Sequence, residues 1–274
     1  MGNSLMEIVA ESKLLTYNLD KSAFMVVGTD KNKKELESDL EKNPLSLCGK
    51  RMKRVNDYTY LGTVISDRGV SESVIASIES KAGKVKQLIC EIRAVVEDCR
   101  NGRPGGFCTA VQIWEAAVIP YLYNAAECWV EVPKEALATL NTLQEAFMSA
   151  MLATPRTTPK AAMYWELAAP LAENRIIEFK LRFYHHLVCL NQDSIAYKVH
   201  ESQRKHNIRS LTSESRAYLA QLNVSESDLK SYSKLAWKKI LGQKMKEKNR
   251  EEILNKMKGL TKYNYFEKKM RNMN

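Results

Sequence analysis

The sequence predicts a mainly α-helical fold with a small antiparallel β element at its N-terminus, an α+β arrangement in which a few strands precede a helical bundle. Three observations predict it. Apolar residues recur at steps of three and four over most of residues 71–190, as amphipathic helices require. Strand and turn signals concentrate in the first 69 residues, and the sequence has no fixed-period repeat. With 274 residues, 45% hydrophobic and 27% charged, the chain is long enough to bury a core.

Short elements separated by polar residues are expected before residue 70. Residues 5–15 suit a short helix, and residues 23–27 suit a strand that ends at Gly28. The segment "DKNKKELESDLEKNP", residues 30–44, is interpreted as a charged connector. Two further strands are expected near residues 45–48 and 58–65, before "DRG" ends the strand-like region.

Helices are expected over most of the remaining chain. The first runs from residue 71 to about 97, with Ser71 or Ser73 as its N-cap. Its apolar stripe comprises Val74, Ile78, Ala82, Val85, Leu88, Ile92 and Val95. A loop is expected at "RNGRPGG", residues 100–106. Further helices are expected at residues 109–127, with a kink or interruption at Pro120, and at 134–152, 160–167 and 173–190.

The positive charge of the chain is concentrated near its C-terminus. The net charge is +10, and residues 229–274 alone carry 14 Lys and Arg against 4 Asp and Glu. Aromatic residues are interleaved with these cations, which predicts a long basic helix followed by a less ordered end. Such a charge balance indicates an acidic partner: nucleic acid, an anionic membrane surface or an acidic protein.

Cysteine usage and the absence of a targeting pattern favour an intracellular protein, in the nucleus or cytoplasm and not secreted. The six cysteines form no CxxC pair, and most have apolar or helical neighbours, which favours reduced thiols over a disulfide framework. The start "MGNSLMEIVAESK" lacks the basic and apolar parts of a signal peptide. The longest apolar region is broken by Pro120, Asn124 and Glu127, so no membrane partner is expected.

The motifs of several enzyme classes are missing from the sequence. It contains no GxxxxGK[ST], no GxSxG and no HExxH, and no two aspartates are adjacent. His185, His186 and Cys189 lie close together, but neighbouring residues point in different directions on a helix, and a zinc site needs four well-placed ligands. Packing and surface roles are favoured for these residues, and no metal site is predicted.

Two stretches resemble the reverse transcriptases of non-LTR (LINE-type) retrotransposons. "YNLDKSAFMVVG", residues 17–28, resembles the N-x-x-K-[ST] segment that follows the catalytic aspartate pair in the family's palm. "RVNDYTYLGTVISDRG", residues 54–69, resembles its Tyr-Leu-Gly primer-grip hairpin, followed by a turn and a long helix. "SVIASIESKAGKVKQL", "VIPYLYNAAECWV" and "LQEAFMSAML" resemble its later helices. The chain departs from the pattern at Asn124, Ala125 and Ala150, where the family usually has Gly or Arg.

The resemblance implies a division of the chain and a parental activity. The regions are a partial palm with a primer-grip-like hairpin at 1–69, a thumb-like helical bundle at 70–153, a helical post-thumb region at 154–228 and a basic helical tail at 229–274. The intact family enzyme is an RNA-directed DNA polymerase that uses magnesium held by aspartates upstream of the N-x-x-K-S segment. Asp20, Asp57 and Asp67 match none of its metal-binding motifs. The chain alone is therefore expected to be inactive, with no catalytic residue and no cofactor, and a separate catalytic palm segment is a candidate partner.

The resemblance and the charge pattern together select residues for contact with RNA, an RNA–DNA hybrid or a DNA duplex. Lys21 matches the family lysine near the nucleotide phosphates, although a surface lysine at a turn is the simpler interpretation. Asn18 and Ser22 are expected to fix that turn by hydrogen bonds to the backbone. The nucleic-acid contacts are expected at Arg51, Lys53, Arg54, Tyr60, Leu61, Gly62, Lys81, Lys84, Lys238, Lys239 and Lys244.

Each of these residues, and the chain as a whole, also has an interpretation without nucleic-acid binding. The hairpin aromatics are equally suited to packing under the thumb, and the helix lysines to a solvated face. The principal functional hypothesis is a reverse transcriptase fragment with salt-dependent nucleic-acid binding. The alternative hypothesis is a helical protein-interaction scaffold or a non-functional remnant of the element. Binding to acidic proteins without affinity for nucleic acid would favour the scaffold.

Overall fold

A computed structural model describes residues 17–18, 21–28, 30–100, 106–155, 157–206 and 210–260. It confirms the predicted class, because long helices dominate and the strands are short, few and confined to residues 23–66. The chain divides into two compact units, Met1–Ser77 and Ile78–Asn274. The expected helix at residues 5–15 lies outside the described residues.

Among its described residues, the first unit contains the strands, helix α2 and the first turns of the helix that begins at Val70. Its elements are β1 (Ala23–Phe24), α2 (Asp30–Lys42), β2 (Ser46–Leu47), β3 (Lys50–Arg51), β4 (Lys53–Arg54), β5 (Asp57–Tyr60) and β6 (Thr63–Ser66). The strands pair two by two. β1 pairs with β4 in parallel, whereas β2 pairs with β3 and β5 with β6 in antiparallel fashion. The segments predicted as strands at 23–27 and 45–48 thus keep only two strand residues each.

The prediction of a polar connector at residues 30–44 was wrong, because most of that segment is helix α2. Lys, Glu and Leu, which dominate it, are strong helix formers. The helix is nearly polar all round and therefore shows no apolar stripe. Ion pairs hold it instead: Lys33 Nζ lies 2.6 Å from Asp67 Oδ2, and Glu37 pairs with Arg54. Both partners are distant in sequence, so no local sequence pattern predicts the helix.

The segment predicted as a strand at residues 58–65 is a hairpin of β5 and β6, as the Tyr-Leu-Gly resemblance implied. Tyr60 faces Thr63 across the pair, and the chain reverses at Leu61 and Gly62. Both turn residues have positive φ, 48° and 79°, as two-residue turns of type I′ require. Glycine adopts this conformation freely, whereas Leu61 is a non-glycine residue in the left-handed region.

Two serines join the hairpin to the long helix α3 (Val70–Arg100). Ser66 N donates to Ser73 Oγ at 2.8 Å, and Val64 N donates to Ser77 Oγ at 2.8 Å. Ser73 Oγ also donates to Gly69 O, so Ser73 belongs to the first turn of the helix and is not its N-cap. The two hydroxyls satisfy edge amides of β6, and they fix the hairpin against the start of α3.

The buried stripe of α3 differs from the predicted one by a single residue at three points. At the first of them, Lys81 is buried where Ala82 was expected. Ile89 and Val96 are buried, where Leu88 and Val95 were expected, and Val95 is exposed. One residue corresponds to about 100° of rotation on a helix. Steps of three and four fit both alternatives, so the sequence pattern alone did not decide between them.

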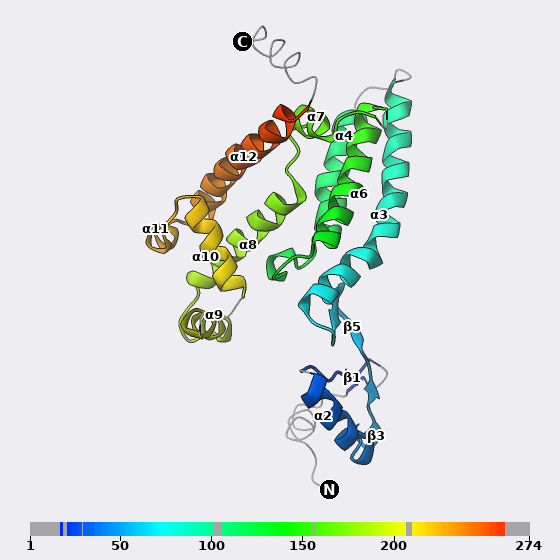
Figure 1. Cartoon of the computed structure of the whole chain (residues 1–274), viewed down its shortest axis with the longest axis vertical. Helices are drawn as coiled ribbons and strands as arrows, with labels where there is room; N and C mark the ends of the chain where they lie inside the picture. Colours follow the sequence, from blue (N-terminus) through cyan, green and yellow to red (C-terminus); the bar gives the residue numbers. More distant parts are fainter. Residues whose placement is uncertain are drawn as a thin grey trace. The chain divides into compact units, whose positions relative to one another are not determined.

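The second unit is wholly helical in its described part. Beyond α3 it contains α4 (Gly106–Ile113), the π-helix η1 (Trp114–Val118), α5 (Ile119–Leu122), the 3-10 turn η2 (Ala126–Cys128), α6 (Lys134–Leu152), α7 (Lys160–Glu166), α8 (Ala172–Val188), α9 (Ile195–His206), α10 (Leu211–Gln221), α11 (Glu226–Ser231) and α12 (Lys234–Lys258). In Figure 1, α12 runs beside α8 and ends at α7, and both helices contact it. The predicted helix at 134–152 is confirmed at both ends.

The interruption predicted around Pro120 is confirmed. The helix widens into one π-helical segment, Trp114–Val118, immediately before this proline, and it ends at Leu122. Proline has no N–H to donate and its ring collides with the carbonyl four residues earlier, which a wider turn relieves. Trp114, at the start of the π-helix, stacks on Phe147 of α6 with ring centroids 4.1 Å apart.

A hydrophobic core of the second unit lies between α8, α10, α11 and α12. Trp237, Leu241 and Met245 of α12 are buried against residues of the other three helices: Ile177, Leu181, Tyr184, Val188, Leu219, Leu222 and Leu229. The buried residues of α12 recur at every fourth position from 237 to 257. Four residues advance about 400° around a helix, so this stripe drifts by about 40° per step. The drift explains why α12 begins on α8 and ends on α7.

Acidification is expected to weaken the contact between α9 and α10. His200 is buried, and desolvation lowers its pKa from the ordinary value of 6.5. The negative charges of Glu201 and Glu226 raise this pKa, whereas the positive charges of Arg204 and Lys230 lower it further. His200 Nδ1 donates to Thr212 Oγ1 at 3.0 Å, because that hydroxyl gives its own hydrogen to Gln203.

A histidine that is neutral when folded gains a proton more readily when unfolded, so its contribution to stability is complete above pH ~6.5 and is lost as the pH falls below that value. Urea unfolding at about pH 7.5 and about pH 5.5 measures this loss. We expect His200→Gln to lose less stability than wild type between these pH values. The same substitution at exposed His206 is the control. An equal loss in wild type and His200→Gln would refute the role of His200.

Candidate nucleic-acid interface

The N-x-x-K-S turn and the hairpin, which are distant in sequence, come together in the first unit. Lys21 N donates to Asn18 Oδ1 at 3.1 Å, and Ser22 Oγ donates to Asn18 O at 2.8 Å. The predicted role of Asn18 and Ser22 in fixing this turn is thereby confirmed. Tyr58 of β5 donates its hydroxyl hydrogen to Lys21 O at 3.1 Å, so the hairpin is tied to the turn.

The tip of the hairpin is exposed, although it carries large side chains. Tyr60 is 59% exposed and Leu61 is 80% exposed, so neither packs into a core. The alternative in which the hairpin aromatics pack inside the protein is thus disfavoured for Tyr60. An exposed tyrosine offers a face on which a base stacks, and Gly62 allows close approach of a ligand to the backbone.

Three basic residues expected at the interface lie on β3 and β4. Arg51, Lys53 and Arg54 are exposed, and β4 is the strand that pairs with β1. Arg54 is held by its ion pair with Glu37. Arg51 and Lys53 form no ion pair within the part of the chain that the structure describes. These two side chains therefore contribute uncompensated positive charge to this surface, as does exposed Lys50 of β3.

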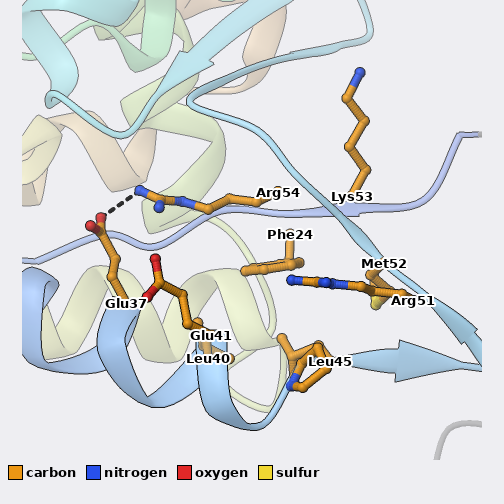
Figure 2. A pocket seen from close by; sticks show the side chains of 10 residues that line it. Phe24, Glu37, Leu40, Glu41, Leu45, Arg51, Met52, Lys53 and Arg54 are labelled. Carbon is orange, nitrogen blue, oxygen red and sulfur yellow. Dashed lines mark hydrogen bonds and ion pairs between the residues drawn. The ribbon is translucent and has the colours of Figure 1, made fainter.

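A pocket of about 380 Å³ opens beside these cations, between α2 and the strands. Phe24, Leu40, Leu45 and Met52 supply its apolar walls. In Figure 2, Arg51 extends alongside Phe24, whereas Lys53 points away from the other lining side chains. Charged side chains complete the lining, among them the carboxylates of Glu37 and Glu41. A cavity with an aromatic ring, a guanidinium plane and carboxylate acceptors suits an unstacked nucleobase, whose edge carries hydrogen-bond donors. The sequence analysis missed this pocket, because α2 supplies one of its walls.

The expected pair of lysines on α3 does not form a common surface. Lys81 is only 4% exposed, and burial lowers the pKa of its ammonium group. Its Nζ has no hydrogen-bond partner within the described residues. Lys81 stands between Ile78 and Val85 at the spacing of the buried stripe, so its expected contact with nucleic acid was wrong. Lys84 is exposed, with its Nζ 5.3 Å from the ring centroid of Tyr121.

The three lysines expected on the C-terminal helix also differ in their surroundings. Lys238 and Lys239 are exposed on α12. Lys244 is half-buried and donates from Nζ to Leu222 O at 2.9 Å, at the C-terminal end of α10. A cation there stabilises the negative end of the helix dipole. The expected contact of Lys244 with nucleic acid is therefore replaced by a structural role.

The carboxylates near the hairpin are engaged by basic side chains. Asp57 lies 3.5 Å from Arg68, and Asp67 is paired with Lys33. Asp20 lies outside the described residues.

In the part of the chain that the structure describes, the histidines of α8 and the adjacent Cys189 form no metal site. His185 Nε2 donates to Tyr232 O at 3.0 Å, which leaves that nitrogen unsuited to a metal ion. Within the described ranges, no group of three or more His, Cys, Asp or Glu is placed to hold a metal.

Comparisons with known proteins add no relative. The chain matches no protein-family model, no curated protein and no solved structure. Among the helices that the structure describes, none combines the length and apolar character needed to cross a membrane. The interpretation of this surface therefore rests on its own residues.

Proposed function

We propose that the chain is the nucleic-acid-binding part of a LINE-type reverse transcriptase, comprising the end of the palm, the primer-grip hairpin and the thumb. The observation that carries this proposal is the hydrogen bond from Tyr58 to Lys21. It joins the two segments that resemble the family, 37 positions apart, into one unit. An enzyme that positions a primer end needs these two segments together.

The surface of the first unit has the chemistry for an extended strand end. Arg51 and Lys53 attract phosphates, Tyr60 offers a stacking face, and Gly62 lets the backbone of a strand approach. The pocket beside Phe24 can accept a base that has left the stack. Because the sequence contains no adjacent aspartate pair, we propose that this chain binds nucleic acid without polymerising it. Magnesium chemistry belongs to the aspartates of the intact family enzyme.

Binding of an RNA–DNA hybrid with a single-stranded end tests the proposal. Fluorescence anisotropy of the full chain at rising salt is expected to show affinity that falls linearly on logarithmic axes. We expect Tyr60→Ala to weaken binding by about tenfold, from the loss of ~1–3 kcal/mol of stacking. Lys53→Gln is expected to reduce the salt slope by about one.

Two variants serve as controls for this experiment. Lys31→Gln removes an exposed charge from α2, and Tyr197→Ala removes an aromatic ring from the second unit. Both variants are expected to leave binding of the overhang unchanged. Absence of binding at low salt would refute the proposal. Binding confined to acidic proteins would favour the helical interaction scaffold instead.

A further inference from the structure

The outer face of α12 carries a line of three cations, of which only Lys239 was among the contacts expected from the sequence. Lys239, Lys246 and Arg250 are all exposed. At about 100° per residue they lie within about 40° of one another around the helix axis, and they form a ridge about 16 Å long. We call these three residues the α12 ridge.

The structure separates the ridge from the other cations of the same helix. Lys244 is bonded to Leu222 O, and Lys248 donates to Asn174 Oδ1 at 3.2 Å and pairs with Glu252. Lys239 and Lys246 have no ion-pair partner among residues 78–100, 106–155, 157–206 and 210–260. The acidic neighbour Glu247 accepts a hydrogen bond from Gln243 at 3.1 Å. The ridge therefore projects net positive charge.

The far end of the ridge meets α7, because the buried stripe of α12 drifts towards that helix. The guanidinium carbon of Arg250 lies 5.2 Å from the ring centroid of Trp165. This contact restrains the longest side chain of the ridge and lowers the entropy cost of holding it against a ligand. Two ridge residues are thus exposed lysines, and the third is an arginine held by an aromatic ring.

We infer that the α12 ridge binds the phosphate backbone of a double helix. Its length corresponds to about five base pairs along a duplex, so three phosphates are within reach. Proteins that bind single strands line their grooves with aromatic platforms. Among the described residues, the aromatic ring found at the ridge is that of Trp165, which Arg250 already covers. An anionic membrane would need an exposed apolar face, but the exposed large apolar residue of α12 is the single Leu235, near the start of the helix.

This inference rests on the proposed function for the class of partner, but it concerns a different unit and a different form of nucleic acid. The first unit has an exposed hairpin tip and a pocket for a strand end, whereas the ridge contacts only the evenly spaced phosphates of a duplex backbone. The two surfaces are therefore testable separately.

The test compares two triple variants of the full chain, matched in charge. The ridge variant carries Lys239→Gln, Lys246→Gln and Arg250→Gln. The control variant carries Lys86→Gln, Lys134→Gln and Lys198→Gln, three exposed lysines on α3, α6 and α9. Affinity for a blunt DNA duplex of about two turns is measured over a range of salt concentrations.

The ridge variant is expected to lower the salt slope by about 2–3, because each phosphate contact contributes about 0.9. The control variant is expected to change the slope by less than about one, because only its net charge differs. A double variant without the Arg250 substitution, which leaves the contact with Trp165 intact, is expected to lower the slope by about two.

Equal slopes in the ridge and control variants would overturn the inference. So would preferential binding of wild type to anionic vesicles or to polyglutamate over the duplex. The variant Tyr60→Ala distinguishes the two proposals, because it is expected to weaken binding of the single-stranded overhang and leave the blunt duplex unaffected. Loss of duplex binding in the ridge variant, with no effect of Tyr60→Ala on the overhang, would support the ridge and refute the proposed primer grip.

Discussion

Replacing Trp237 with alanine is expected to lower the free energy of unfolding by about 3–5 kcal/mol. Trp237 is 1% exposed, and the centroid of its indole lies 6.1 Å from that of the His185 ring and 6.2 Å from that of the Tyr232 ring. Its Nε1 donates to Leu181 O at 3.2 Å, across 56 positions of the sequence. The substitution opens a cavity in the α8–α12 core and removes this hydrogen bond between the two helices.

Chemical unfolding followed by circular dichroism measures the effect of Trp237→Ala. Leu235→Ala is the matched control, because Leu235 lies on the same helix and is 79% exposed. That control is expected to change the free energy by less than about 0.5 kcal/mol. A similar small change for Trp237→Ala would mean that α12 does not pack on α8 as described.

Glu214→Ala is expected to destabilise the protein by about 3–5 kcal/mol, because it strands the buried ammonium group of Lys180. The side chains of Lys180 and Glu214 are 2% and 17% exposed, and they form an ion pair between α8 and α10. Glu214 also accepts from Glu131 N at 2.8 Å. Removing the carboxylate therefore leaves the buried charge of Lys180 without its ion-pair partner, with only the ring of Tyr218 at 6.0 Å beside it among the described contacts.

Two further variants separate this electrostatic effect from simple loss of contacts. Lys180→Met combined with Glu214→Gln removes the buried charge and keeps an acceptor for Glu131 N, so it is expected to be more stable than Glu214→Ala alone. Glu201→Ala removes the exposed pair with Arg204 and is expected to cost less than about 1 kcal/mol. If Glu214→Ala costs no more than Glu201→Ala, the buried pair does not hold α8 to α10.

The helices with a regular apolar stripe were predictable from the sequence, and those held by other forces were not. Helix α6 was predicted to the residue because Leu140, Gln144, Phe147 and Met151 repeat along one buried face. Helix α2 was missed because its stabilising partners, Asp67 and Arg54, are supplied by other elements. A helix without an apolar face leaves no periodic signal.

The candidate site was predictable to a similar degree. The turn at Asn18 and the hairpin at Leu61 and Gly62 were found, because turn residues act locally. Which lysines are exposed could not be predicted, because charge alone does not determine whether a side chain faces solvent. Lys81 carried a signal in its spacing from Ile78 and Val85, whereas Lys244 carried none, because its acceptor lies in α10.

Asn249 has a consequence for the order in which the protein is made. Its amide accepts from Leu171 N and donates to Ala169 O, two groups of the α7–α8 loop that lie about 80 positions earlier. During synthesis, α7 and α8 emerge from the ribosome with these groups and their apolar faces uncovered. They remain so until α12 follows. The second unit therefore reaches its final structure only after translation has passed residue 249, and until then this segment is open to chaperones and proteases.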